Sequence, residues 1–309
     1  MLIGQSNLAG AQSAFVALFQ EAFNAHSGPY LHDLLSVDYK TDARFVRVPV
    51  VASMPGLRRW TGSKYFKSPR AYELTNTILS YEKSIELDRL DLDSQGSDAV
   101  AQQLSVFLGS AKRDLTKLLW TSIKANTWTA YDASTLLADA HPHTNSSGDN
   151  LTTSALSHSA LKSGKAAMRR FQDEDGNLLD ISPTHLIVGP AQENLAKELT
   201  GAFRPVYVNA SGAEATSSVV AATTSPNAFQ GDMVVFVCPE IAGNEWAIAD
   251  LSKPGLRPVV RYVKRELEPV MQNQMTDEGR FLFDKYRFSV EGDFVYGPGA
   301  WQTIYGSVS

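Results

Sequence analysis

The first pattern along the chain is an apolar stripe with helical spacing close to the N-terminus. Within residues 9–25, apolar side chains recur three and four positions apart, at Phe15, Leu18, Phe19, Ala22 and Phe23. This spacing predicts a short amphipathic helix with one apolar face. Such a face requires a groove to cover it, and we expect that groove on the same chain or on a neighbouring copy.

Two strand-like runs then flank a segment of different composition. Phe45–Val51 precedes this segment, and Tyr72–Leu87 follows it with partial alternation of apolar and polar residues. Residues 54–70 hold five cations and no acidic residue, interleaved with aromatic residues: Arg58, Arg59, Lys64, Lys67 and Arg70, with Trp60, Tyr65 and Phe66. The pattern predicts a long two-stranded hairpin with a basic, aromatic tip.

A hairpin of this kind is marginal by itself, because two strands bury no core and leave unpaired edges. We therefore expect it to lie on another surface, and a second copy of the chain is the most economical source of one. This is the first indication that the chain assembles.

The longest helical pattern follows an acidic stretch. Asp88–Asp98 is predicted to form a turn, and Ser97 to cap a helix that continues through Ile123. The helix would be roughly 40 Å long, enough for a spine that spans the molecule. Its apolar positions are Val100, Leu104, Phe107, Ala111, Leu115, Leu118 and Leu119.

The remainder of the chain mixes helical and strand-like patterns without an internal repeat. We expect helices at Ser154–Phe171 and Pro190–Leu199, and a loop rich in Ala, Ser and Thr at Ala210–Asn227. The expected strands are His185–Val188, Pro205–Asn209, Met233–Cys238, Glu245–Ala249 and Arg257–Val263, followed by an aromatic, β-like tail at Phe281–Val290, Phe294–Tyr296 and Trp301–Tyr305. This mixture predicts α+β lobes that share interleaved segments.

Composition and charge narrow the function classes. The 309 residues are 43% hydrophobic and 20% charged, which is typical of a folded protein, and no apolar run approaches the roughly 18 residues that cross a bilayer. A net charge of −5 argues against a protein whose main task is to grip nucleic acid. A protein that encloses DNA without binding it tightly is compatible with this charge, because an acidic surface does not attract the negatively charged polymer. Cys238 is the only cysteine, so an internal disulfide is impossible and a buried, inert thiol is expected.

Two partial matches to ligand-binding motifs fail at a required position. Asp91, Asp93, Gln95 and Gly96 resemble the start of a calcium-binding loop, but Gln102 stands where a bidentate glutamate is needed. Gly164-Lys165 lacks both the following Ser/Thr and the first glycine of a phosphate-binding loop. We therefore predict no cofactor.

A metal site is conceivable at His141, His143 and Asp139, but no further ligand has suitable spacing. An exposed polar loop is the preferred interpretation. The chain also lacks a Gly-x-Ser-x-Gly elbow, and its carboxylates are scattered. We predict neither a catalytic nor a metal site.

The basic, aromatic tip permits two interpretations. Cations interleaved with aromatic residues can bind single-stranded nucleic acid. Alternatively, the tip of one copy could complement the acidic Asp88–Asp98 stretch of another, which would fix the register of assembly. The acidic chain as a whole favours the subunit interface.

Three segments carry a resemblance to a known family. They are Gly56-Leu57-Arg58-Arg59-Trp60-Thr61-Gly62, then Tyr81-Glu82-Lys83-Ser84-Ile85-Glu86-Leu87-Asp88-Arg89, and Leu137–His143 leading to Asn145-Ser146-Ser147-Gly148. In this order they resemble the major head subunit of Mu-like bacteriophages, and the order of elements resembles the HK97-like capsid fold. The resemblance spans nearly the whole chain.

The resemblance implies a division of the chain. Residues 1–43 would form an N-terminal arm, 44–90 an extended loop, 91–185 and 266–309 a peripheral domain with the spine helix, and 186–265 an axial domain. It also implies pentamers and hexamers of the chain itself, with a scaffolding protein, a portal and a maturation protease as assembly partners. Double-stranded DNA would be packaged without sequence-specific binding, in a virion capsid that assembles in the host cytoplasm without a membrane.

The sequence thus predicts an α+β, HK97-like major capsid protein that is not an enzyme. Its alternatives are an encapsulin-like nanocompartment shell, a soluble metal-dependent enzyme and a single-strand nucleic-acid binder. The predicted inter-subunit contacts are Phe15, Phe19, Arg58, Arg59, Trp60, Lys64, Phe66, Lys67, Asp88, Asp91 and Asp93.

Overall fold

A computed structural model describes most of the chain from Tyr30 onward. The described residues are 30–51, 59, 62, 66, 71–142, 148–173, 176–201, 203–208, 221–227, 229–272 and 285–308. The predicted N-terminal helix at residues 9–25 lies outside these ranges. No helix within them is both long and apolar enough to cross a membrane.

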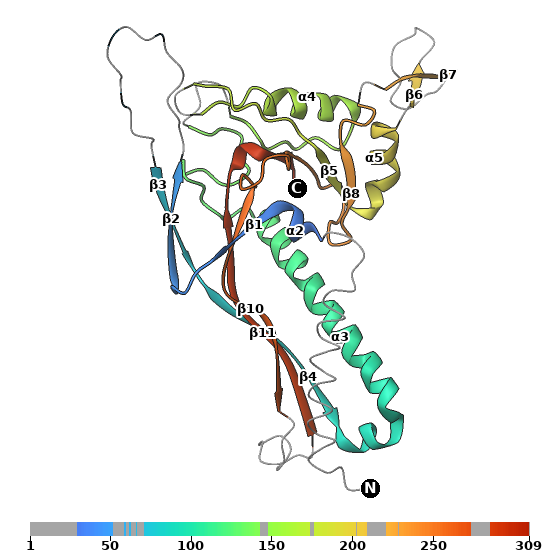
Figure 1. The fold of residues 1–309 in the computed structure, drawn as a ribbon. Coiled ribbons are helices and arrows are strands. Elements are labelled where there is room, and N and C mark those ends of the chain that lie inside the picture. The colour runs from blue at the N-terminus through green and yellow to red at the C-terminus, as the bar shows by residue number, and fades with distance from the viewer. Residues whose placement is uncertain are drawn as a thin grey trace.

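A long four-stranded sheet and a long helix form the frame of the molecule (Figure 1). The strand order is β1-β10-β11-β4, with β1 parallel to β10 and the other pairs antiparallel. The elements are β1 (Ser36–Lys40), β10 (Val259–Gln272), β11 (Lys285–Pro298), β4 (Leu79–Asp88) and the helix α3 (Arg89–Ala125). Figure 1 shows α3 beside the far part of these strands, so the frame is elongated.

Helix α3 confirms the predicted spine helix but begins earlier than expected. It contains 37 residues and is therefore roughly 55 Å long. The predicted turn at Asp88–Asp98 is wrong, because Asp88 ends β4 and the helix starts at Arg89. Ser97 is consequently inside the helix and is not its cap. One internal glycine costs a helix only about 1 kcal/mol, and acidic residues are favourable in a first turn, so the stretch tolerates helical structure.

The buried face of α3 follows the predicted spacing. Phe107, Leu108, Ala111, Leu115, Leu119 and Ile123 are all buried. Several of these residues belong to one continuous core that also includes residues of both four-stranded sheets. The helix and the sheets are therefore held together by a single hydrophobic cluster.

The second sheet forms a compact lobe at one end of the frame. Its order is β12-β9-β5-β8, in which β5 is parallel to β8 and antiparallel to β9. The strands are β12 (Ile304–Ser307), β9 (Trp246–Ala249), β5 (His185–Val188) and β8 (Val234–Val237), with 3₁₀ turns at Pro190–Gln192 and Trp301–Thr303. All four residues of β9 are buried. The strands predicted at β5, β8 and β9 are confirmed, whereas the predicted strand Trp301–Tyr305 begins only at Ile304, after a 3₁₀ turn.

Three short helices complete the architecture, namely α2 (Leu31–Leu35), α4 (His158–Met168) and α5 (Glu193–Thr200). The Ser157 hydroxyl caps α4 by accepting a hydrogen bond from the Ala160 N–H. The 3₁₀ turn begins at Pro190, and α5 follows it. Gly201 is the C-cap of α5, so the proline and the glycine bound the helix as the sequence predicts. The helices expected at Ser154–Phe171 and Pro190–Leu199 are thus confirmed with shorter bounds.

Two two-stranded ribbons project from this body: β2 (Phe45–Val51) with β3 (Ala71–Thr77), and β6 (Phe203–Val208) with β7 (Ala221–Pro226). The first confirms that the run after the basic segment returns antiparallel to the run before it. However, the predicted single strand Tyr72–Leu87 is two strands, because β4 leaves the ribbon and pairs with β11. The predicted loop Ala210–Asn227 is also partly wrong, since β7 is a strand.

Substitution of Gly306 should disrupt the second sheet. A Cβ atom there would lie 2.3 Å from the Trp246 carbonyl oxygen and 2.8 Å from the Ala247 Cα, both on the backbone of β9. We expect Gly306→Ala to lower the free energy of unfolding by about 3 kcal/mol or to prevent folding. Chemical unfolding of the purified subunit measures this.

The matched control is Gly109→Ala in α3, where a Cβ atom meets nothing within 4 Å. Alanine favours a helix over glycine by about 0.5–1 kcal/mol, so this variant should be neutral or more stable. Equal effects of the two substitutions would contradict the described packing of β12 on β9.

Candidate assembly surfaces

The β2–β3 ribbon is fixed to the frame by a small hydrophobic cluster of its own. Val46 and Ile78 pack with Tyr262 of β10, which is only 1% exposed. The Ile78 N–H donates to the Arg44 carbonyl oxygen over 3.0 Å at the same place. The root of the ribbon is therefore rigid, and the direction in which it leaves the body is set by buried contacts.

Large apolar side chains remain exposed around this root. Phe45 is 59% exposed, Leu79 50% and Tyr39 45%. The Arg44 guanidinium lies 5.9 Å from the centre of the Phe45 ring, and the Tyr39 ring stacks on Tyr262 at 6.1 Å. Single exposed apolar residues are common, but three at the root of one projecting ribbon favour a contact with another molecule.

Only three residues between the two strands of the ribbon are described. Arg59, Gly62 and Phe66 are exposed, and Phe66 is 87% exposed. Gly62 has a φ of +108°, a conformation that side chains rarely adopt. The high exposure of Phe66 means that the described part of the subunit does not cover its aromatic ring.

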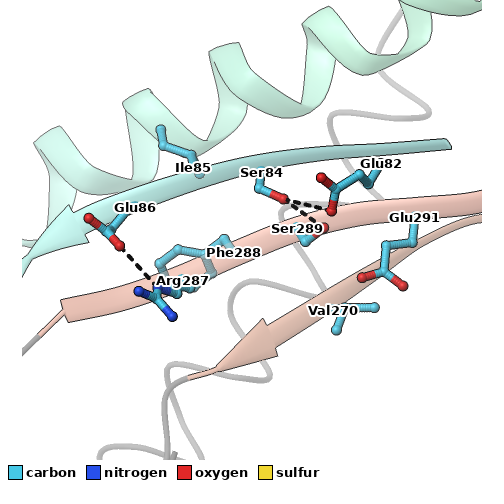
Figure 2. A pocket seen from close by; sticks show the side chains of 9 residues that line it. All are labelled: Glu82, Ser84, Ile85, Glu86, Val270, Arg287, Phe288, Ser289 and Glu291. Carbon is cyan, nitrogen blue, oxygen red and sulfur yellow. Dashed lines mark hydrogen bonds and ion pairs between the residues drawn. The ribbon is translucent and has the colours of Figure 1, made fainter. Parts of the chain in front are cut away.

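The far part of the long sheet carries a polar hollow of about 330 Å³ on β4, β11 and β10 (Figure 2). Every second residue of β4 contributes to it, namely Glu82, Ser84 and Glu86. β11 contributes Arg287, Ser289 and Glu291 in register with them. Ile85, Val270 and Phe288 add an apolar part.

The charges in this hollow are only partly compensated. Lys285 and Arg287 both donate to the Glu86 carboxylate, and these hydrogen bonds lower the pKa of Glu86. Ser84 donates to Glu82 over 3.5 Å and lies 3.2 Å from the Ser289 hydroxyl. Beside it, Arg265 pairs with Glu291 and Asp293. The acidic residues outnumber the cations that they face, so the surface has an acidic balance.

The opposite side of the same strands faces α3 and forms a groove of about 460 Å³. Its lining is largely apolar and comes from both the helix and the sheet: Tyr81, Ala111, Leu115, Leu118, Leu267, Val290 and Phe294. Lys83 of β4 pairs with Asp114 of α3 at 2.5 Å beside it. The groove thus lies between the two elements that give the frame its length.

The described chain begins at a clamp on α3. The His32 Nδ1 atom lies 2.9 Å from the Thr116 hydroxyl, and Lys112 lies 5.3 Å from the centre of the Tyr30 ring. In β1, Asp38 accepts hydrogen bonds from Arg261 of β10. Residues 30–40 are therefore held by the frame.

The predicted contact residues divide into two groups. Arg59 and Phe66 are exposed, whereas Phe15, Phe19, Arg58, Trp60, Lys64 and Lys67 lie outside the described residues. Asp88 is the last residue of β4, and Asp91 and Asp93 belong to the first two turns of α3, which follows directly. Figure 1 shows the β2–β3 ribbon and this β4–α3 junction well apart on the molecule.

Sequence reasoning missed the acidic hollow between these two regions. Glu82, Ser84 and Glu86 alternate along β4, which is the signal for one polar face of a strand. Their partners Arg287, Ser289 and Glu291 follow about 200 residues later in the chain, and alternation alone does not identify a partner strand. Only the register of β4 with β11 joins the two sets.

The exposed loop expected at the candidate metal residues is wrong for His141. His141 is 3% exposed and its ring contacts Asp132 and Asn150, whereas Asp139 is exposed and His143 is not among the described residues. In the part of the chain that the structure describes, no three His, Cys, Asp or Glu side chains are grouped to hold a metal ion. Cys238 is buried as predicted, and its burial raises the pKa of the thiol.

The fold and these surfaces define an HK97-like capsid subunit, and comparison with known proteins agrees. Residues 71–307 match the profile of a family described as phage capsid protein. The chain belongs to this family and is a phage capsid protein. No curated protein sequence matches it.

Solved capsids show the same fold at low sequence identity. A chain of the bacteriophage JBD30 procapsid is 17% identical with a TM-score of 0.57, over 99% of this chain and 76% of that chain. The Microbacterium phage Oxtober96 structure is 12% identical with a TM-score of 0.55, over 91% of each chain. A virus-like particle from Pyrococcus furiosus is 13% identical with a TM-score of 0.53, over 96% and 98%. Sequences have therefore diverged widely on a shared HK97-like architecture.

The clamp at His32 should make the subunit sensitive to acid. Burial lowers the pKa of His32 from 6.5 to about 4, so the unfolded chain takes up a proton first as the pH falls. Stability from this residue is complete above pH 6.5 and is lost towards pH 4, by at most about 3 kcal/mol. Chemical unfolding of the subunit at several pH values measures the loss.

His32→Gln serves as the control, because glutamine can bond Thr116 and does not titrate. This variant should lose less stability than the original protein between pH 6.5 and 4. An identical pH dependence in the two proteins would show that His32 is not the sensitive group.

Proposed function

We propose that this chain is the major subunit of the icosahedral head of a tailed, Mu-like bacteriophage, and that it encloses double-stranded DNA. The family match and the HK97-like fold support this proposal, and the segments around Gly56 and Tyr81 favour the Mu-like branch. Copies would close a shell as pentamers and hexamers, with a scaffolding protein, a portal and a maturation protease assisting assembly. Assembly would take place in the host cytoplasm.

We assign the parts of the shell subunit as the sequence suggests. Residues 1–43 act as the N-terminal arm, 44–90 as the extended loop, and 186–265 as the axial domain. Residues 91–185 and 266–309 make up the peripheral domain, and α3 serves as its spine. In support, α3 and β11 contribute to one hydrophobic cluster in the elongated frame.

The interaction that carries the proposal is the complementarity between the two ends of the subunit. The basic segment 54–70 of one copy lies on the acidic face of a neighbour, over Glu82, Glu86 and Glu291 and towards Asp88, Asp91 and Asp93. In support of an intermolecular contact, the β2–β3 strands that lead to this segment and the β4–α3 junction lie well apart within one copy (Figure 1). Such charge pairing selects the correct register more than it adds affinity.

Removal of the basic segment tests the contact directly. Val51 pairs with Ala71, so deletion of 54–70 leaves Ala52 and Ser53 as a two-residue connection, which Asn-Gly in their place would favour. The root cluster around Tyr262 is untouched, and the subunit should fold with unchanged stability but form no normal shells. Electron microscopy and chemical unfolding measure the two properties. Normal shells from this variant would refute the proposed contact.

Exchange of the charges on the two surfaces tests whether assembly depends on their electrostatic attraction or only on their shape. Glu82→Lys with Glu291→Lys should reduce the yield of shells at least about 10-fold, because like charges then face each other. Arg58→Glu with Arg59→Glu should do the same, and the combined variant should recover assembly. Failure of the combined variant, with each subunit folded, would mean that these two regions do not meet.

A nanocompartment shell is the alternative function, and the likeness to the particle from Pyrococcus furiosus over nearly the full length of both chains keeps it open. The phage capsid family match favours the virion. Cargo distinguishes the two, because a phage head encloses DNA and a nanocompartment encloses protein.

A further inference from the structure

A buried histidine joins three separate segments of the chain. The side chains of His141 and Asp132 are both fully buried, and the His141 Nδ1 atom lies 2.5 Å from the Asp132 Oδ2 atom. The His141 Nε2 atom lies 3.2 Å from the Asn150 Oδ1 atom. The imidazole ring also stacks on the Trp301 indole, with ring centres 3.6 Å apart and parallel planes.

The orientation of the Asn150 amide is determined by its other partners. Its Oδ1 atom accepts a hydrogen bond of 2.8 Å from the Ala138 N–H. Its Nδ2 atom faces the carbonyl oxygens of Leu136, Trp301 and Ile304 at 2.9, 3.1 and 3.2 Å. A rotated amide would set oxygen against three oxygens, so Oδ1 must face His141. The Nε2 atom of His141 must therefore carry a proton.

The second ring nitrogen faces an acid. If Nδ1 also carries a proton, the ring is a cation and Asp132 a carboxylate; otherwise Asp132 is protonated and the ring is neutral. Imidazole is the stronger base of the two. The flat face of Trp301, on which the imidazole ring stacks, also favours a cation.

We infer that His141 is a buried imidazolium ion, which fastens the C-terminal segment to the loop after α3 through Asp132, Asn150 and the ring of Trp301. Asp132 and His141 follow α3, whereas Trp301 and Ile304 lead into β12. A neutral ring cannot donate from both nitrogens, so it must lose a hydrogen bond to Asp132 or Asn150. The interaction with Trp301 weakens at the same time. This clasp goes beyond the shell contacts proposed above.

Nitrogen NMR of histidine-labelled protein tests the inference, in the free subunit or in assembled particles. The chain has six histidines, and His141→Gln identifies the signals that belong to His141. At pH 7.5 both ring nitrogens of His141 should have shifts of protonated nitrogens. One unprotonated nitrogen, in either tautomer, would overturn the inference.

A second measurement does not depend on the assignment by His141→Gln. Asp132→Asn removes the carboxylate and should increase hydrogen exchange of the β12 amides at least about 100-fold at pH 7.5. Asp139→Asn is the control, because Asp139 is exposed in the same loop and its substitution should leave this exchange unchanged. Equal protection in Asp132→Asn and Asp139→Asn would contradict the clasp.

Discussion

A ribbon of two strands has no core, and this constraint explains how the subunit is built. The β2–β3 ribbon is stable only where Val46 and Ile78 reach the main body at Tyr262. Beyond that root its stability must come from another surface. The long frame of α3 and the β4–β11–β10 strands supplies such a surface on every copy. We therefore propose that the rigid frame and the ribbon without a core are two halves of one contact between copies.

Electrostatics gives this contact a direction. Segment 54–70 has only positive charges, and the far face of the frame has an acidic balance around Glu82, Glu86 and Glu291. Buried apolar clusters hold the root of the β2–β3 ribbon and the frame in place within the subunit. The exposed charges then need only to choose the register between subunits, which is the role that screened surface charges perform best. A net charge of −5 also leaves the shell without a strong attraction for packaged DNA.

The sequence predicted most elements where the spacing of apolar residues is regular, as in α3 and the strands of the second sheet. The prediction from sequence failed where contacts with distant parts of the chain override the local sequence pattern. Gly96 and Ser97 look like a helix boundary, but α3 continues through them because the strand before it leads straight into the helix. Tyr72–Leu87 reads as one strand, yet β3 and β4 pair with different partners. His141 was expected to be exposed, yet it is buried, and its contact with Trp301 joins positions 160 residues apart.

The central claim is that each copy lays its basic ribbon on the frame of the next. Cryo-electron microscopy of particles assembled from the purified protein measures this most directly. We expect closed shells in which residues 54–70 of one subunit cover Glu82, Glu86 and Glu291 of its neighbour. Shells in which these residues fold back on their own subunit, or a protein that stays monomeric at every concentration, would contradict the account.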